Sequence, residues 1–352
     1  MNKFWSSRLS GITPYVPGEQ PKNIKLIKLN TNENPYPPSP KVTAAVNALP
    51  APQYRLYPDP ECVSLREAIA ETHGVRSEQV FVGNGSDEIL AFAFLGLFDP
   101  GREIVFADIT YSFYPVYAKF FNLDYRLIPL NDDFTVNVDA YCGGNYGVVL
   151  ANPNAPTGID MGLDNIERIL KSNPDCAVIV DEAYVDFGCE SAVGLVDKYP
   201  NLLVIRTFSK SRSLAGLRIG YAIGDENLIG ALNCVKNCIN SYTLDRVALT
   251  AAQAAVEDRE YFDETRSRII ATRQRTAAAL RELGFTVTDS KTNFLFASHP
   301  RISGGEMFTA LRNRGILVRH FNAPRIDNWL RITVGTDGEM DELIKALGEI
   351  LN

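Results

Sequence analysis

The sequence has few histidines and no paired cysteine motif, and both absences limit the metal chemistry that it can support. Its three histidines are far apart among 352 residues, and its six cysteines show no C-x-x-C spacing. Zinc and similar centres usually need closely spaced ligands, so no metal site is predicted. Cys234 and Cys238 lie four residues apart without a second ligand pair. Small buried thiols in a reducing compartment are the favoured interpretation.

Long apolar runs and a surplus of positive charge are also missing. The longest apolar run, Ile89–Phe98, is about half the length of a membrane-spanning helix and suits a buried one. Residues 1–11 contain no apolar segment typical of a secretory signal. There are 42 acidic and 35 basic residues, for a net charge of −7, whereas binding to a nucleic-acid backbone needs a basic surplus. We therefore expect a cytoplasmic protein with neither nucleic-acid nor membrane partners.

Short apolar segments rich in β-branched residues recur between residues 79 and 224, with helical patterns between many of them. Several lack alternation, which is typical of strands that are covered on both faces. This succession predicts an α/β domain with a mostly parallel sheet. The expected strands are Gln79–Val82, Ile104–Ala107, Tyr125–Leu130, Gly147–Leu150, Ala177–Val180, Leu202–Arg206 and Ile219–Ile223, and the expected helices include Ser86–Leu97 and Asp164–Ser172.

The pattern changes near residue 245, where a compact α+β unit is predicted. It begins with a long amphipathic stretch, Arg246–Leu283, which ends at Gly284. The further elements are strands at Phe285–Thr288, Phe294–Ala297, Ile316–His320 and Leu330–Val334, and helices at Gly305–Arg314 and Asp337–Leu351. Residues 1–40 are rich in proline and asparagine and are interpreted as an arm that packs over another part of the molecule. We thus expect an arm (1–40), a large domain (41–245) and a small domain (246–352).

Lys210 is the first candidate for chemistry, because it closely follows a predicted buried strand. Ligands in α/β folds bind at the carboxyl edge of the sheet, where a partly desolvated amine is a nucleophile toward a carbonyl carbon. An isolated loop lysine is usually only solvated. Here Ser209 adjoins it and Arg218 lies eight residues further on. Because Gly216 and Gly220 permit close backbone approach, the segment predicts an anion site around a reactive amine.

Asp181 follows the preceding predicted strand, 29 positions before Lys210. Consecutive strands of an α/β sheet usually lie close together, so both side chains could face one crevice. A carboxylate within reach of a ring nitrogen can hold that nitrogen protonated. Without the lysine, a helix cap or a strand-end turn would explain Asp181 equally well.

A glycine turn joins the first predicted strand of the sheet to a helix. Gly85, Ser86 and Asp87 would present free backbone N–H groups at the positive end of that helix, which suits a phosphate group. An ordinary helix cap by Ser86 is the alternative. The turn lacks the last glycine of the G-x-G-x-x-G motif that is typical of nicotinamide-dinucleotide sites. The sequence therefore does not favour a site of that kind.

Four strings that occur in order along the chain together resemble fold-type I pyridoxal-phosphate aminotransferases. They are GNGSDE at 83–88, NAPTG at 154–158, DEAY at 181–184 and the segment 209–220 that holds the serine, lysine, arginine and glycine described above. Three more, LNTNENP at 29–35, LYPD at 56–59 and LRITVG at 330–335, resemble the histidinol-phosphate aminotransferase family within that group. The resemblance covers nearly the whole chain. It implies an α/β fold-type I transferase, with a mostly parallel central sheet in a large domain and a smaller α+β domain.

The resemblance implies roles around the cofactor pyridoxal phosphate. Lys210 would hold it covalently and carry a proton between the substrate α-carbon and carbon C4′ of the cofactor. Asp181 would pair with the ring nitrogen, so that the ring accepts electrons, and Tyr184 would hydrogen-bond the phenolic oxygen. Tyr111 would stack on the ring, or would simply pack beneath the glycine turn. The phosphate would be held by residues of the glycine turn and of the lysine segment, namely Gly85, Ser86, Asp87, Ser209 and Arg218.

One position departs from the family pattern. The residue before the Pro-Thr-Gly turn is usually an asparagine that contacts the phenolic oxygen, and here it is Ala155. Either Asn154 takes over from one position earlier, which we favour, or the contact is lost and Tyr184 acts alone.

Substrate binding is predicted from five further residues. Arg331 would bind a phosphate or a carboxylate in turn, and Arg319 would assist, unless each is a surface arginine with its stem packed on a strand. Asn30, Tyr15 and Tyr57 resemble family residues near the substrate. In that family Tyr57 reaches in from the partner subunit, which implies a homodimer with shared active sites. The three histidines are expected to be structural or on the surface.

The implied activity is a transaminase of histidine biosynthesis. It would interconvert histidinol phosphate plus 2-oxoglutarate with imidazole-acetol phosphate plus glutamate. An aromatic amino-acid aminotransferase and a phosphothreonine decarboxylase-like lyase are the enzymatic alternatives. A ligand-binding regulator without turnover is less consistent with a chain that carries no basic DNA-binding segment.

Overall fold

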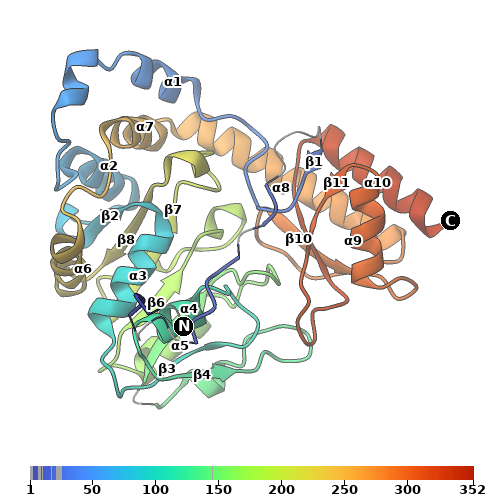
Figure 1. The fold of residues 1–352 in the computed structure, drawn as a ribbon, viewed down its shortest axis with the longest axis horizontal. Coiled ribbons are helices and arrows are strands. Elements are labelled where there is room, and N and C mark those ends of the chain that lie inside the picture. The colour runs from blue at the N-terminus through green and yellow to red at the C-terminus, as the bar shows by residue number, and fades with distance from the viewer. Residues whose placement is uncertain (1–2, 7–8, 10, 17, 21–25, 145) are drawn as a thin grey trace.

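The computed structural model describes residues 3–6, 9, 11–16, 18–20, 26–144 and 146–352, so parts of the predicted arm 1–40 lie outside the described residues. Its main element is a seven-stranded sheet (Figure 1). In spatial order the strands are β2 (Val80–Gly83), β8 (Gly220–Gly224), β7 (Leu202–Thr207), β6 (Val178–Asp181), β5 (Gly147–Ala151), β3 (Ile104–Ala107) and β4 (Tyr125–Ile128). Only β8 runs antiparallel to its neighbours, so the predicted, mostly parallel sheet is confirmed.

Both faces of this sheet are covered, because successive side chains of its central strands point into opposite cores. In β7, Leu202 and Val204 belong to one buried cluster, and Leu203 and Ile205 to another. The helices that contribute to the first cluster are α2 (Val63–His73), α5 (Leu163–Ser172) and α7 (Arg246–Glu257). Those that contribute to the second are α3 (Gly85–Leu97), α4 (Tyr114–Phe120) and α6 (Glu226–Ile239). The result is a three-layer α/β/α arrangement that exposes its strand ends, rather than its faces, to ligands.

A second, antiparallel sheet lies on the other side of the molecule (Figure 1). In spatial order its strands are β12 (Arg319–His320), β13 (Leu330–Thr333), β10 (Phe294–Ser298) and β9 (Thr286–Val287). Its core is shared with α8 (Arg259–Glu282), α9 (Gly304–Asn313) and α10 (Asp337–Leu351). The two sheets fall within the ranges predicted for the large and small domains, whereas the domain boundaries themselves stay a prediction.

The described part of the arm joins the second sheet to the first. Strand β1 (Ile27–Lys28) pairs in parallel with β11 (Ile316–Leu317), and the Leu29 carbonyl oxygen accepts a 3.0 Å hydrogen bond from the backbone of Thr333. The chain then runs past the strand ends of the large sheet to α1 (Pro40–Asn47), which contacts α7. Six short 3₁₀ helices complete the described elements, at Ala51–Arg55, Ser77–Gln79, Val138–Tyr141, Val185–Phe187, Ala192–Leu195 and Ala215–Leu217. None of the helices within the described ranges is long and apolar enough to cross a membrane.

Two elements that were each predicted as one continuous helix or strand are divided in two in the structure. The stretch Arg246–Leu283 is two helices, α7 and α8, because Asp258 leaves the helical conformation and its carboxylate accepts hydrogen bonds from Ser39 and Lys41. The strand expected at Ile316–His320 divides into β11 and β12, which pair with β1 and β13 respectively. Both differences depend on partners that are distant in the sequence.

The prediction of buried thiols is also wrong for two of the six cysteines. Cys234 and Cys238 are exposed on α6, whereas Cys62 and Cys176 are buried. Within the described residues none of the six forms a disulfide bond. The four-residue spacing of Cys234 and Cys238 therefore places both thiols on the outer face of a surface helix.

Candidate active site

The carboxyl ends of β5, β6 and β7 open into a cavity of about 410 Å³. Its other walls are the first turn of α3, the arm residues 30–33, and arginines from β12 and β13. The predicted site residues that line it are Tyr15, Asn30, Ser86, Asp87, Tyr111, Asp181, Tyr184, Ser209, Lys210, Arg218, Arg319 and Arg331. The described residues that line it do not include Gly85, Asn154 or Tyr57.

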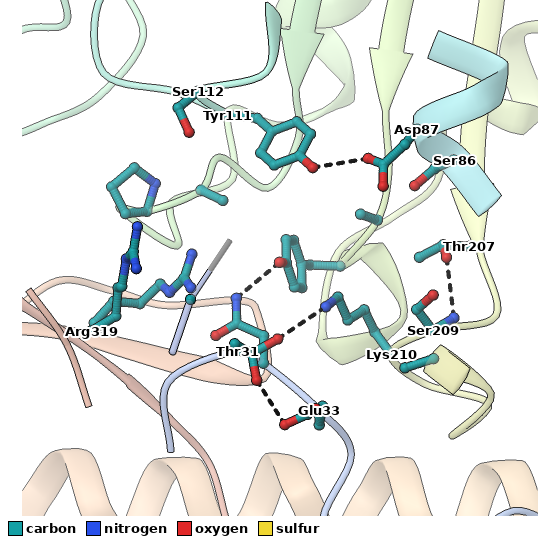
Figure 2. A pocket seen from close by; sticks show the side chains of 18 of the residues that line it. Thr31, Glu33, Ser86, Asp87, Tyr111, Ser112, Thr207, Ser209, Lys210 and Arg319 are labelled. Atoms are coloured by element: carbon teal, nitrogen blue, oxygen red, sulfur yellow. Dashed lines mark hydrogen bonds between the residues drawn. The ribbon is translucent and has the colours of Figure 1, made fainter. Parts of the chain in front are cut away.

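Lys210 presents its amine to the cavity, and the loop that carries it is held on two sides. Its Nζ donates a 3.3 Å hydrogen bond to the Thr31 carbonyl oxygen (Figure 2). The Asn34 side chain donates a 2.9 Å bond to the Lys210 carbonyl oxygen. On the other side Ser211 donates to Asp186. The loop is thus held in place, and the half-buried amine makes one long hydrogen bond, to a neutral acceptor, within the described part of the chain.

Asp181 lies at the end of β6, and its backbone is in register with Ile205 of β7. Its side chain is almost fully buried and accepts hydrogen bonds from the Tyr114 hydroxyl at 2.8 Å and the Ala183 backbone N–H at 3.2 Å. Burial raises the pKa of the carboxyl to about 6, and these two hydrogen bonds oppose the rise. Such a site favours a cationic partner, which would stabilise the carboxylate.

Backbone N–H groups and a guanidinium group meet at the start of α3. The helix begins at Gly85, which has a φ of +80°, and the first N–H groups of a helix have no intrahelical acceptor. Asn84, not Ser86, is the N-cap residue, so the helix-cap alternative for Ser86 is wrong. Arg218 donates a 3.1 Å hydrogen bond to Asp87. In Figure 2, Ser86, Asp87 and Ser209 lie on the same side of the cavity.

Two glycines make this close packing possible. A Cβ atom on Gly220 would lie 2.5 Å from the Ser86 backbone nitrogen, and one on Gly85 would lie 2.8 Å from Arg218 Nη2. Gly216 lines the cavity but is not packed against other parts of the chain, so its role in close approach stays a prediction. A Cβ atom there would meet no described atom within 4 Å.

Tyr111 contacts the glycine turn and also lines the cavity, so packing at the turn is observed and stacking on a cofactor ring stays a prediction. Its hydroxyl donates a 2.9 Å hydrogen bond to Asp87 of the glycine turn, and its ring lines the cavity (Figure 2). Tyr184 follows β6 at the edge where the lysine loop follows β7, and its ring centre is 5.7 Å from Lys210 Nζ. Its hydroxyl oxygen accepts a 2.9 Å hydrogen bond from the Asn32 amide.

The favoured prediction for Asn154 has to be corrected, because the structure turns its amide away from the cavity. Its Nδ2 donates to the Ile109 carbonyl oxygen at 2.9 Å and to Thr157 at 3.0 Å. Its Oδ1 accepts a 2.9 Å hydrogen bond from Thr110. The side chain is buried with both polar atoms in use, and Ala155 lines the cavity in its place. The geometry therefore favours the second alternative, in which Tyr184 acts alone.

Two arginines from the second sheet face the same cavity. Arg331 donates a 3.1 Å hydrogen bond to the Asn30 carbonyl oxygen, and its guanidinium lies 5.5 Å from the ring centres of Phe294 and Phe321. Arg319 is half-buried at one side of the cavity (Figure 2), and its guanidinium lies 5.6 Å from the ring centre of Phe321. Arg331 Nε and Asn30 Oδ1 are shielded from solvent and have no hydrogen-bond partner among the described residues. This pair of arginines can bind an anion inside the cavity, which a surface arginine cannot.

The two predicted substrate tyrosines lie in different places. Tyr15 lines the cavity, and its ring stacks on Phe113 with centres 4.7 Å apart. Tyr57 is 79% exposed and stacks on Tyr242 at the molecular surface. It therefore does not contact the cavity of its own chain.

The sequence-based interpretation missed several residues that hold the site together. Thr31, Asn32 and Asn34 contact the lysine loop and Tyr184, although they stood within the LNTNENP string. Tyr114, which bonds Asp181, lies in the same segment as Tyr111. Their positions in these strings were the available signal, but only the fold shows which side chains they meet.

The groups around the cavity fit pyridoxal phosphate by their chemistry. The start of α3, Ser209 and Arg218 supply donors for a doubly charged phosphate group. The buried carboxylate of Asp181 suits a protonated ring nitrogen, because a cation there offsets the cost of burying the carboxylate. Lys210 offers the amine that condensation with an aldehyde requires. The described residues contain no group of three or more metal-ligating side chains.

Comparison with known proteins agrees with this chemistry. The family model for aminotransferase class I and II matches residues 24–347. A histidinol-phosphate aminotransferase of Clostridium acetobutylicum is 55% identical over the full length of both chains. Histidinol-phosphate aminotransferase 2 of Dechloromonas aromatica is also 55% identical, over 99% of both chains.

Solved structures show the same similarity. A putative histidinol-phosphate aminotransferase from Erwinia carotovora atroseptica superposes with a TM-score of 0.85 at 27% identity, over 92% of this chain and 96% of that one. The histidinol-phosphate aminotransferase of Sinorhizobium meliloti, in complex with pyridoxal-5'-phosphate, has a TM-score of 0.81 at 25% identity. That match covers 92% of this chain and 90% of the other.

Proposed function

Since the chain belongs to the aminotransferase class I and II family, we propose that it is a pyridoxal-phosphate-dependent transaminase of histidine biosynthesis. Its reaction converts histidinol phosphate and 2-oxoglutarate into imidazole-acetol phosphate and glutamate. The observation that carries the proposal is the convergence of Lys210 and Asp181 with two arginines on one cavity. A reactive amine, a buried carboxylate and an anion site are the three groups that this reaction needs.

The cofactor would be held at three places. The first-turn amides of α3 with Ser209 and Arg218 would bind its phosphate, Asp181 its ring nitrogen, and Lys210 its aldehyde carbon. When bound, pyridoxal phosphate supplies a carbonyl group that exchanges for an amino group and a ring that accepts electrons as the α-proton leaves. Lys210 Nζ would take the proton from the substrate α-carbon as a general base and deliver it, as a general acid, to the cofactor carbon C4′. Asp181 keeps the proton on the ring nitrogen.

The arginines would serve both substrates of the cycle. Arg331 and Arg319 would bind the phosphate group of histidinol phosphate in one half-reaction and a carboxylate of glutamate in the other. A guanidinium group suits this task, since its planar donors match either oxyanion. Asn30, whose Oδ1 has no partner among the described residues, would add a polar contact for the bound substrate.

The proposal is tested by a single half-reaction. Purified holoenzyme is mixed with histidinol phosphate in the absence of any keto acid, and the absorption of the aldehyde form of the cofactor should be replaced by that of the amine form. Phenylalanine and phosphothreonine are tested in parallel. Conversion by phenylalanine alone would assign the aromatic alternative, and release of carbon dioxide from phosphothreonine would assign the lyase. A spectrum that no substrate changes would support the ligand-binding regulator.

A homodimer with shared active sites is part of the same proposal. It is supported by Tyr57, which is exposed beside Tyr242 and is free to reach a cavity of a second copy. The cytoplasmic location follows from the biosynthetic role and stays a prediction. Gel filtration with light scattering would measure the mass of the assembly directly.

A further inference from the structure

The contact to the phenolic oxygen of the cofactor has to be made with fewer donors than the family pattern provides. Ala155 carries no donor, and the amide of Asn154 is used by Ile109, Thr157 and Thr110. Tyr184 is the remaining predicted donor. The direction in which its hydroxyl proton points therefore decides whether this contact forms.

Asn32 bonds this hydroxyl from the arm. Its Nδ2 lies 2.9 Å from the Tyr184 oxygen, and the residue is 1% exposed with a φ of +57°. Its backbone N–H donates a 2.9 Å hydrogen bond to Thr333 Oγ1, and its carbonyl oxygen accepts a 3.0 Å bond from Asn293. Both partners belong to the second-sheet region, at β13 and just before β10. Asn32 is therefore held in a left-handed conformation by tertiary contacts.

The orientation of the Asn32 amide follows from the hydroxyl of Thr333. That hydroxyl accepts from the Asn32 backbone, so its own proton needs an acceptor, and Asn32 Oδ1 lies 3.1 Å away. Thr333 is buried, so leaving this proton unpaired would be costly. With Oδ1 bonded to Thr333, Nδ2 must face Tyr184. The Tyr184 oxygen then acts as an acceptor toward Asn32, and its single proton is available to the cavity.

We propose that Asn32 is a positioning residue that turns the hydroxyl proton of Tyr184 toward the phenolic oxygen of the cofactor, with Thr333 fixing the amide. The inference rests on the proposed function, since it assumes pyridoxal phosphate in the cavity. A hydroxyl that accepts a hydrogen bond also becomes a better donor. The arm and the second sheet thereby tune a cofactor that is bound mainly by the first sheet.

The test measures the pH midpoint at which the absorption of the bound cofactor changes. A donor to the phenolic oxygen stabilises its negative charge and so lowers this midpoint. Tyr184→Phe should raise the midpoint by about one pH unit, and Asn32→Gly by roughly half of that, as expected for the loss and the weakening of one hydrogen bond. Glycine is chosen because it adopts the φ of +57° without strain. Thr333→Val should give a rise similar to that of Asn32→Gly, which provides a second variant if one of them does not fold.

The matched control is Asn32→Gly in the Tyr184→Phe background, where no further shift is expected. An equal shift in both backgrounds would show that the amide acts by another route and would overturn the inference. The inference would also be overturned if Tyr184→Phe raised the pH midpoint while Asn32→Gly and Thr333→Val left it unchanged. If the wild-type protein binds pyridoxal phosphate with no titrating absorption at all, the proposed function fails instead.

Discussion

The hydroxyl group of Tyr114 donates a 2.8 Å hydrogen bond to the carboxylate of Asp181, with both side chains in the interior of the large sheet. Tyr114 stands in α4 and Asp181 at the end of β6, so the contact ties a helix to the edge where the cavity opens. It partly offsets the cost of a buried charge. The offset is incomplete, since the pKa of Asp181 is still raised to about 6.

Asp181→Asn should alter how the stability of the cofactor-free protein depends on pH. Because the pKa is higher in the folded chain than its ordinary 3.8, the neutral carboxyl gives full stability at low pH. That stability is lost as the pH rises through about 6. Relative to the variant, the wild type should lose at most ~3 kcal/mol between pH 4 and pH 8. Urea unfolding at both pH values measures this, and parallel curves for the two proteins would contradict it. The variant should also lose transaminase activity.

Lys210→Ala should abolish turnover with little effect on folding. Catalysis should fall by about three orders of magnitude or more, while stability changes little because the amine makes only a 3.3 Å hydrogen bond to Thr31. Borohydride should bleach the absorption of wild-type holoenzyme and attach the cofactor to this residue, as peptide mapping by mass spectrometry can show. Lys198→Ala, on the exposed surface, is the control. Undiminished activity in Lys210→Ala would remove the lysine from the mechanism.

Gly220→Ala should damage the phosphate end of the site. The added Cβ atom would lie 2.5 Å from the Ser86 nitrogen, so the first turn of α3 must shift, at a cost of about 1–3 kcal/mol in stability. The affinity for pyridoxal phosphate should fall by about tenfold or more for a similar loss of binding energy. Gly230→Ala is the matched control, because a Cβ atom there meets nothing within 4 Å and helices favour alanine. Equal affinities in the two variants would be inconsistent with the packing described.

A mixture of two damaged proteins should recover activity if the sites are shared. Tyr57→Ala removes the residue proposed to reach the partner's cavity, and Lys210→Ala removes the amine of its own. Each protein alone should be weakly active or inactive. After unfolding and refolding together, about a quarter of wild-type activity is expected, because half of the dimers are mixed and each mixed dimer holds one intact site. Mixed dimers that form but stay inactive would argue against sharing.

The strands of the large sheet were predictable because they are short, buried and rich in β-branched residues. Ile104–Ala107 agrees with its predicted bounds, and most others differ by only one or two residues at an end. The break at Asp258 was not predictable, because it depends on Ser39 and Lys41. A periodic apolar pattern continues across such a break, and nothing local interrupts it.

Those parts of the site were predictable in which the chemistry requires one particular kind of side chain, such as an amine or a carboxylate. Lys210 and Asp181 follow strands that end at the same edge, so the fold class alone brings them together. Asn154 was misjudged because it stands one position before Ala155, where the family has its contact residue, whereas its amide is taken by Thr110 and Thr157. Asn32 was overlooked because its partner Tyr184 is 152 residues away. Amide orientation depends on such partners, and spacing along the chain does not reveal it.

The reversed direction of β8 has a consequence for how the site can change over evolution. Because β7 and β8 are antiparallel, residues 208–219 leave and re-enter the sheet at one edge. A single short loop therefore carries both Lys210 and Arg218. We propose that these two residues bind opposite ends of the same cofactor molecule. The length of this loop limits the distance between the Lys210 amine and the Arg218 guanidinium. An insertion or deletion within it would change which molecular lengths are accepted, without disturbing either strand.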